Sequence, residues 1–210
     1  MDEMNDRELF RVRLLFLDLV KSFFVDEPDA EKMSRWRGTF SALTKEQVSP
    51  RFDNAVSEIS KALNSKNLKD LQDEFYKLFT DPFDGCAIET TASYYLNGKS
   101  YSQALVDIRG LMDEAEIIKD MAISDPEDSL VVMLDTFASL VEEERVAGGE
   151  KVKELQGRLL SEFLEPFTEK FTAVLKENEH ADFYYLCCRV LAGYLDLEKG
   201  LVVSVNVSKS

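Results

Sequence analysis

The chain has 210 residues, of which 45% are hydrophobic and 31% charged, so it can bury a core and has the composition of a folded globular protein. Its 25 basic and 40 acidic residues give a formal net charge of −15. A field of this sign repels the phosphate backbone of nucleic acids and anionic membrane surfaces. The single histidine, His180, leaves no material for most histidine-based catalytic or metal-binding sets. We therefore expect neither a nucleic acid partner nor an enzyme.

The cysteines and the apolar segments indicate the compartment. Cys86, Cys187 and Cys188 form no C-x-x-C pair and are odd in number, which excludes a secreted disulfide framework and a zinc site of that type. The adjacent Cys187 and Cys188 lie in an apolar run and are expected to be buried, with a redox role as the alternative. The N-terminus, 1–6, is acidic where a signal peptide is basic, and no apolar stretch approaches the ~18 residues of a membrane span. We expect a cytoplasmic protein with no stable membrane insertion.

Apolar residues recur at helical spacing through the first half of the chain. Steps of three and four residues separate Leu9, Val12, Phe16, Leu19 and Phe23. This stripe predicts a helix that ends before Pro28, and a weaker pattern predicts a second helix over 31–43. Ser49 followed by Pro50 indicates the start of a third helix, and Asn67 the start of a fourth that ends at Asp81.

The second half begins with a segment that has no helical stripe. Residues 80–100 carry turn chemistry at both ends and are expected to form a long connection. Apolar spacing then predicts one helix over 105–115 and another over 130–141. The latter opens at Asp125, as its N-cap, with Pro126 at the first helical position.

Two more helices complete the pattern. Gly148 and Gly149 separate the preceding helix from a long one over 152–174, in which Pro166 is a possible kink, and the last helix covers 183–197. Residues 201–207 form the only β-like stretch, expected to be a frayed end or an edge. Because no repeat or sustained heptad is present, the sequence predicts an all-α, compact single-domain bundle of about seven to ten helices. The domain is expected over 1–200, with a C-terminal tail over 201–210.

The densest acidic group, Asp125–Asp128, has two explanations. Carboxylates at a helix start satisfy free N–H groups and the helix dipole, but the same group could bind a metal or a basic peptide. An aromatic and aliphatic set is either core or the wall of a groove; its members are Phe75, Leu78, Phe79, Phe83, Tyr94 and Tyr95. An acidic surface beside an apolar groove would suit a ligand with positive charge followed by a hydrophobic segment. We find no phosphate loop, nucleophile elbow or metal-ligand cluster, so no catalytic residue, metal or cofactor is expected.

Four segments in order resemble the TorD/DmsD/NarJ family of chaperones for molybdopterin-containing oxidoreductases. They are Asp73–Pro82, with a Glu-aromatic-x-x-Leu-Phe pattern; Ser93–Leu96 with the helix around Arg109; Asp125–Leu130, an acidic-Pro-x-Asp pattern; and Phe163–Phe167 with Asp182–Tyr185. The resemblance spans about residues 8–199. It departs from the family at Ser129, where histidine is usual, and at Phe167, where tryptophan is frequent.

The resemblance implies a cytoplasmic chaperone of the TorD-like fold that binds the N-terminal leader, or the apo form, of a molybdenum oxidoreductase catalytic subunit. It would assist cofactor insertion and proofreading before export or assembly. Carboxylates could pair with the arginines of a twin-arginine leader, while an apolar groove takes the segment behind them. On this hypothesis the groove is shaped by Phe75, Tyr76, Leu78 and Phe79. The leader's positive charge is met by Asp125, Glu127 and Asp128, with Tyr94, Pro126 and Ser129 in the same site.

Two matters remain open at this point. The alternative function is an acidic helical interaction or regulatory protein that recognises another basic or amphipathic partner. The oligomeric state could be a monomer or a dimer that exchanges helical elements between protomers.

Overall fold

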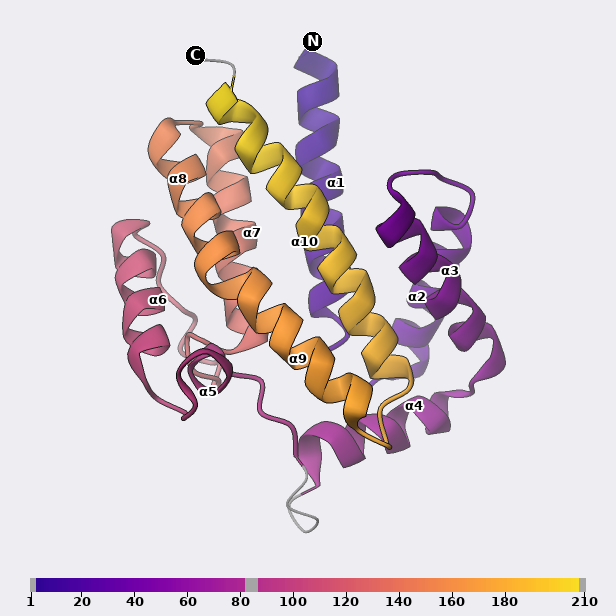
Figure 1. The fold of residues 1–210 in the computed structure, drawn as a ribbon. Coiled ribbons are helices and arrows are strands. Elements are labelled where there is room, and N and C mark those ends of the chain that lie inside the picture. Colours follow the sequence, from indigo (N-terminus) through magenta and orange to yellow (C-terminus); the bar gives the residue numbers. More distant parts are fainter. Residues whose placement is uncertain (1–2, 82–86, 208–210) are drawn as a thin grey trace. The chain divides into compact units, whose positions relative to one another are not determined.

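The regular secondary structure of the described chain is entirely helical (Figure 1). The computed structural model describes residues 3–81 and 87–207, and the side chains of 6–81 and 87–202. Within these ranges the elements are α1 (Glu3–Lys21), α2 (Ala30–Leu43), α3 (Pro50–Ser65), α4 (Leu68–Phe75), the π-helical turn η1 (Tyr76–Thr80), α5 (Ala92–Asn97), α6 (Gln103–Glu114), α7 (Leu130–Val146), α8 (Glu150–Arg158), the π-helical turn η2 (Leu159–Leu164), α9 (Glu165–Glu177) and α10 (Phe183–Val207). The only β-type pairing in these ranges is one isolated bridge, and the all-α prediction is confirmed.

The chain divides into two compact units. Unit 1 consists of Met1–Lys21, Thr90–Phe167 and Leu195–Ser210, and unit 2 of Ser22–Glu89 and Thr168–Tyr194. The single domain over 1–200 with a tail stays a prediction. No described helix has the length and apolar character that crossing a bilayer requires.

Local capping rules account for the helix starts in unit 2. The Asp29 carboxylate accepts a hydrogen bond from the Lys32 N–H at 2.7 Å and so caps α2. Ser49 caps α3, whose first position is proline as predicted. Asn67 and Asp70 form a reciprocal capping box at the start of α4. The four helices predicted in the first half of the chain are therefore confirmed.

The predicted irregularity at Pro166 takes the form of a π-helical turn. Proline has no N–H, and in an α-helix its ring would clash with the carbonyl four residues earlier. In η2 the hydrogen bonds reach one residue further, and the Glu165 N–H bonds to the Leu160 carbonyl. The helical run from α8 through α9 therefore continues past Pro166 without a break.

The end of the chain corrects one prediction. Residues 201–207, expected as a β-like tail, continue α10 through Val207. The α8 and α10 helices approach closely here, because a Cβ at Gly157 would lie 3.3 Å from a methyl carbon of Val202. Val202, whose residue type favours strands, thus lies in a helix against α8.

Aromatic side chains fill the interior of unit 2. Trp36 contacts the rings of Phe23 and Phe183 with centroids 5.1 and 5.8 Å apart, and its indole N–H donates to Ser22 Oγ at 2.9 Å. The α3 and α10 helices pack so closely that a Cβ at Gly193 would lie 3.1 Å from the Phe52 Cα. A buried tryptophan with its polar group satisfied anchors this core.

In unit 1, α7 contacts α1, α8 and η2 (Figure 1). A buried arginine, Arg13, joins α1 to α7, α8 and α10. The Arg13 guanidinium of α1 donates to Glu144 of α7 at 2.9 Å, to Gln156 of α8 at 2.8 Å and to Glu198 of α10 at 3.0 Å. The buried face of α1 therefore includes Arg13 and Leu17. The predicted stripe is wrong at its beginning, since Leu9 and Val12 are exposed. The buried face of α1 thus carries a charged residue, Arg13, where the spacing predicts apolar residues.

Replacing Arg13 should destabilise the fold severely. In Arg13→Ala the Glu198 carboxylate stays buried and loses its guanidinium partner, and breaking such a pair costs about 3–5 kcal/mol. We expect the free energy of unfolding in urea to fall by about this amount. Arg145→Ala, which removes an exposed guanidinium paired with Glu142, is the control and should leave stability unchanged. Equal stability of the two variants would contradict this account.

The buried cysteines should be inert in the native protein. Cys187 and Cys188 lie in α10 and are fully buried, and burial raises the pKa of both thiols well above the usual value. Cys86 lies outside the described residues. In a Cys86→Ser variant we expect no reaction with a thiol reagent at mildly alkaline pH until denaturant is added. Rapid modification of the native variant would contradict the burial and restore the redox alternative.

Candidate functional site

The acidic motif, defined here as Asp125–Ser129, forms a turn before α7 and not the first turn of the helix. The Ser129 N–H donates to the Pro126 carbonyl at 3.0 Å. Ser129 is the N-cap of α7, since its hydroxyl accepts from the Val132 N–H at 3.3 Å. The prediction of Asp125 as N-cap with Pro126 at the first helical position is therefore wrong. Ser129, which stands where the resemblance expects histidine, is therefore the residue that caps α7.

The turn is held by an antiparallel bridge to the segment before α5. Thr91 pairs with Ser129, with hydrogen bonds from the Ala92 N–H to the Asp128 carbonyl at 2.7 Å and from the Leu130 N–H to the Thr90 carbonyl at 2.9 Å. The pairing places the Asp128 side chain at the N-terminus of α5.

Asp128 is the capping residue of α5. Its Oδ2 accepts from the Ser93 N–H at 2.8 Å, while Thr91, the N-cap by position, makes no side-chain cap bond. The side chain is only 1% exposed, and its Oδ1 has no hydrogen-bond partner in the described part of the chain. A buried carboxylate at a helix N-terminus is favoured by the free N–H groups and the helix dipole. Asp128 therefore has a structural function that the sequence did not predict.

The other two carboxylates of the motif face solvent to different degrees. Asp125 is exposed, and its backbone carbonyl accepts from Lys119 Nζ at 2.6 Å. Glu127 is partly exposed and forms an ion pair of 2.9 Å with Arg109 of α6. Desolvation, the largest single cause, acts to raise the pKa of Glu127, but the hydrogen bonds from Arg109 and from its own backbone, together with the charges of Arg109 and Lys119, outweigh it and lower the pKa below the usual value. Glu127 therefore carries negative charge at neutral pH, and both side chains are accessible to a cationic ligand.

Tyr94 completes the accessible part of this group. It lies on α5, a helix within the segment predicted as a long connection, and is 45% exposed. Its ring contacts that of the buried Tyr95 with centroids 5.3 Å apart, and Tyr95 contacts Phe167 at 5.2 Å. Unit 1 thus presents Tyr94, Asp125 and Glu127 at its surface, with Asp128 beneath them.

The predicted groove residues of the segment 75–79 belong to unit 2. Phe75 and Leu78 are buried, Phe79 is half-buried and Tyr76 is 44% exposed. The rings of Phe75 and Phe79 lie 5.2 Å apart, and both contact Tyr184. Most of this segment is interior, so Tyr76 is the member most open to a ligand. Phe83, in the same predicted stripe, lies outside the described residues.

Sequence reasoning missed another buried carboxylate that caps a helix, that of Glu74. Its Oε1 accepts from the Asp182 and Tyr184 N–H groups at 2.8 and 2.9 Å, so α4 caps the distant start of α10. The Lys66 Nζ lies 3.9 Å from the Glu74 Oε2. Desolvation raises the pKa of Glu74 although the backbone N–H groups and Lys66 oppose this. Glu74 and Asp182 are 108 positions apart in the sequence, so no local pattern predicts this cap.

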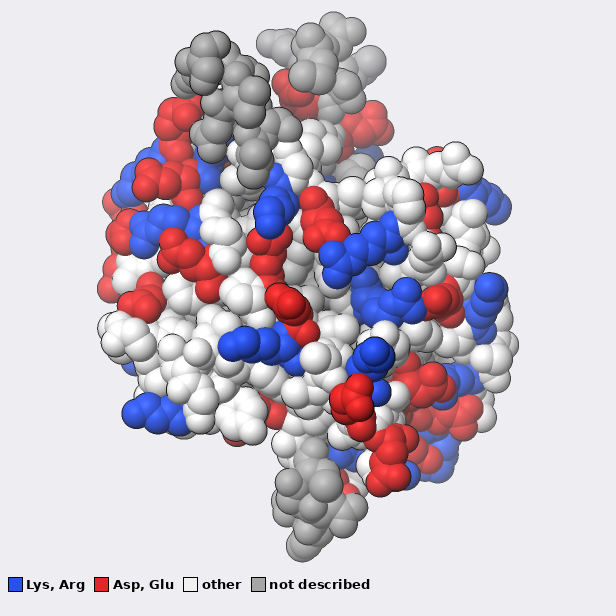
Figure 2. All heavy atoms as spheres, in the orientation of Figure 1, with Lys and Arg blue, Asp and Glu red and all other residues white. Residues whose placement is uncertain are grey.

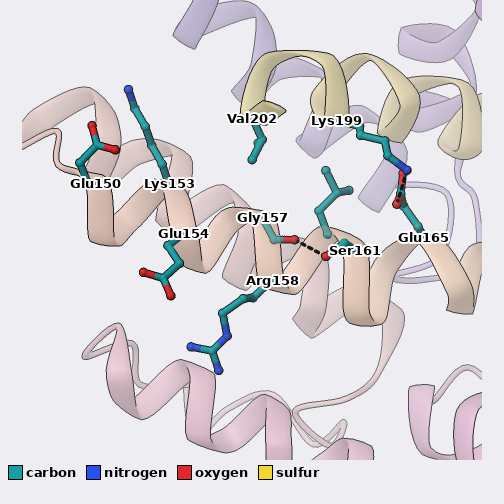
Figure 3. Close-up of a pocket in the computed structure, with 10 residues that line it drawn as sticks. Glu150, Lys153, Glu154, Gly157, Arg158, Ser161, Glu165, Lys199 and Val202 are labelled. Atoms are coloured by element: carbon teal, nitrogen blue, oxygen red, sulfur yellow. Dashed lines mark hydrogen bonds and ion pairs between the residues drawn. The ribbon is translucent and has the colours of Figure 1, made fainter. Parts of the chain in front are cut away.

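One hollow of the described surface lies between α8, η2 and α10. This groove, of about 460 Å³, has charges of both signs on its lining (Figure 3). Lys199 bonds to Glu165 at 2.9 Å, and Ser161 Oγ donates to the Gly157 carbonyl at 2.7 Å. On the face drawn in Figure 2, basic and acidic side chains are likewise interleaved. None of the predicted site residues lines this groove.

The described residues contain no cluster of His, Cys, Asp or Glu suited to a metal ion. Unit 1 offers two accessible carboxylates, those of Asp125 and Glu127, and an exposed aromatic ring, that of Tyr94. This chemistry is that of recognition by ion pairing and stacking.

Comparison with known proteins identifies the family. The sequence profile described as nitrate reductase delta subunit matches residues 45–173, which include both buried capping carboxylates. This chain belongs to that family. It is the family of NarJ/TorD-like chaperones, so the resemblance seen in the sequence is confirmed.

One solved structure with the same fold is a crystal structure from Archaeoglobus fulgidus, described as a redox enzyme maturation protein. It superposes with a TM-score of 0.55 at 17% identity, over 88% of this chain and 93% of that one. The predicted TorD-like, all-helical fold is confirmed by this likeness. No curated protein matches the chain.

Removal of the Asp128 carboxylate should loosen α5. Asp128→Ala leaves the Ser93 N–H without its acceptor, and an unsatisfied buried group costs about 1–3 kcal/mol. We expect the urea midpoint to fall and the Ser93 amide to lose protection from hydrogen exchange. Asp125→Ala is the matched control, since its exposed side chain caps nothing described. Unchanged exchange at Ser93 would show that Asp128 does not cap α5.

Proposed function

We propose that this protein is a cytoplasmic maturation chaperone that binds the N-terminal leader of the catalytic subunit of a molybdenum oxidoreductase. It holds the apo subunit until the cofactor is inserted and so prevents premature export or assembly. The observation that carries this proposal is the match to the nitrate reductase delta subunit family over residues 45–173.

The charge of the chain supports a leader as the ligand. A twin-arginine leader presents guanidinium groups followed by an apolar stretch, and a protein of net charge −15 attracts such a segment. Guanidinium groups form their strongest hydrogen bonds with carboxylates, because two N–H donors match two acceptor oxygens.

Within unit 1 the residues take distinct parts. Asp125 and Glu127 meet the leader's arginines, and Glu127 exchanges its bond to Arg109 for one to the ligand. Tyr94 offers an exposed ring on which a guanidinium can stack. Asp128 acts by holding α5, and therefore Tyr94, in position, while Pro126 and Ser129 shape the turn. In unit 2, Tyr76 is the exposed member of an aromatic segment whose remaining residues, Phe75, Leu78 and Phe79, hold its backbone in place.

A pull-down from native cytoplasm tests the function as a whole. The tagged chain should recover one molybdenum-enzyme catalytic subunit, identified by mass spectrometry, and deletion of that subunit's leader should abolish recovery. Recovery of unrelated partners, or recovery that does not depend on the leader, would favour the alternative of a general acidic interaction protein.

Neutralising the two accessible carboxylates should weaken leader binding. For Asp125→Asn with Glu127→Gln we expect a loss of about 5–10-fold in affinity for the leader peptide at low salt, since each exposed ion pair contributes modestly. The loss should shrink at high salt because ions screen exposed charges. Calorimetry with the leader peptide measures both effects.

The control for this experiment removes the same charge elsewhere. Glu177→Gln with Glu179→Gln changes the net charge equally at two exposed positions of unit 2. If this control weakens binding as much as the Asp125 and Glu127 variant, the effect belongs to net charge and those two residues are not the site.

A further inference from the structure

The connection between α5 and α6 carries an exposed aromatic side chain on an unfavourable backbone. Tyr101 is 77% exposed, so its ring adds little to the core of unit 1. Its φ of +53° lies in the left-handed region. A Cβ makes this conformation unfavourable, and glycine or asparagine is the usual residue there.

Hydrogen bonds on both sides of Tyr101 hold its backbone. The Asn97 Oδ1 accepts from the Ser102 hydroxyl at 2.8 Å and from the Ala104 N–H at 2.9 Å. The Ser102 N–H donates to the Ser93 Oγ at 3.1 Å. Because the connection is tied to both α5 and α6 at these points, Tyr101 keeps a conformation that it would not adopt by itself.

The bare ring does not compensate for this conformation. Burial of an aromatic side chain could offset the cost of the backbone, but the Tyr101 ring faces solvent. Residues held in the left-handed region against their own preference cluster at ligand-binding and active sites. A ligand at this connection would contact the exposed ring first.

Ser93 joins the connection to the acidic motif. Its N–H donates to the Asp128 Oδ2 at 2.8 Å, and its hydroxyl accepts from the Ser102 N–H. Tyr94 follows Ser93 and Tyr101 precedes Ser102, so each exposed tyrosine lies one Cα–Cα step, about 3.8 Å, from this contact. Both rings therefore belong to the end of α5 that the acidic motif caps.

The charge of this region favours a cationic ligand. Residues 90–129 include three basic and eight acidic residues, a net charge of 3 − 8 = −5, and the carboxylates of Asp125 and Glu127 are accessible. A guanidinium group can donate to a carboxylate with its edge while its face stacks on an aromatic ring. A lysine ammonium is a strongly hydrated point charge without such a face. Carboxylates beside exposed rings therefore suit arginine better than lysine.

We propose that Tyr101 selects arginine over lysine in the leader. This inference rests on the proposed function and adds a residue that determines its specificity. A twin-arginine leader carries two guanidinium groups; one stacks on Tyr94 and the other on Tyr101, while Asp125 and Glu127 accept their N–H donors. The left-handed backbone at Tyr101 presents the ring to the ligand.

Two model leader peptides provide the test. Each has a pair of adjacent basic residues followed by about 12 apolar residues, and the pair is Arg-Arg in one peptide and Lys-Lys in the other. Calorimetry with the full chain measures both affinities. We expect the wild type to prefer the arginine peptide. Tyr101→Ala should lose about 3–5-fold in affinity for the arginine peptide and less than about 2-fold for the lysine peptide, because an exposed stacked guanidinium contributes modestly.

Three further variants separate recognition from stability. Tyr101→Phe keeps the ring and should bind both peptides as the wild type does. Val146→Ala removes an exposed apolar side chain at the opposite end of α7 from the acidic motif and should change neither affinity. Tyr101→Gly relieves the left-handed backbone, so its urea midpoint should not fall although its affinity for the arginine peptide falls as in Tyr101→Ala.

Several outcomes would overturn the proposal. Equal loss for both peptides would show that the ring contacts their shared apolar segment, and no loss in Tyr101→Ala would remove the residue from the site. Failure of the wild type to bind either peptide, or a lower urea midpoint in Tyr101→Gly, would also contradict it. The pull-down tests the proposed function separately, since leader-dependent recovery of a catalytic subunit requires no selection by Tyr101.

Discussion

The bond between the Asp128 carboxylate and the N-terminus of α5 is the constraint on which the surface of unit 1 depends. A helix of six residues is far too short to be stable alone, and Thr91 at its N-cap position makes no side-chain bond to it. Asp128 supplies that bond from 35 residues further along the chain. Because the motif turns inward to do so, Asp125 and Glu127 remain outside, where charge is accessible.

The same physical solution recurs in unit 2. Glu74 of α4 is buried and caps the start of α10 through two backbone N–H groups. Both carboxylates lie in segments whose resemblance to a chaperone family rests on their acidic residues. In each segment the buried carboxylate stabilises a helix end, so an acidic residue in a binding motif is no evidence by itself of contact with a ligand. Asp125 and Asp128 are the same type of residue, and it is their exposure that shows which of the two a ligand can contact.

The parts of the fold that could be predicted from sequence are those decided by nearby residues. Ser49 and Asn67 act on N–H groups three positions away, and the starts of their helices were predicted correctly. The start of α7 was not, because Asp125 and Pro126 satisfy the local rules equally well. Pairing with the segment before α5 selects Ser129 instead. Long-range pairing of this kind is not encoded in helical periodicity.

The candidate sites show the same limit in terms of exposure. Ile118 and Met121 lie beyond the helix predicted over 105–115, and no pattern in the sequence predicts that both side chains are exposed. Both side chains belong to a turn in which Asp120 accepts from the Ala122 and Ile123 N–H groups. Conversely, Arg13 resembles a surface residue in sequence but is the buried centre of unit 1. Whether a side chain is available for binding is therefore decided by tertiary contacts, and the accessible carboxylates of Asp125 and Glu127 are where recognition of a cationic ligand should be sought.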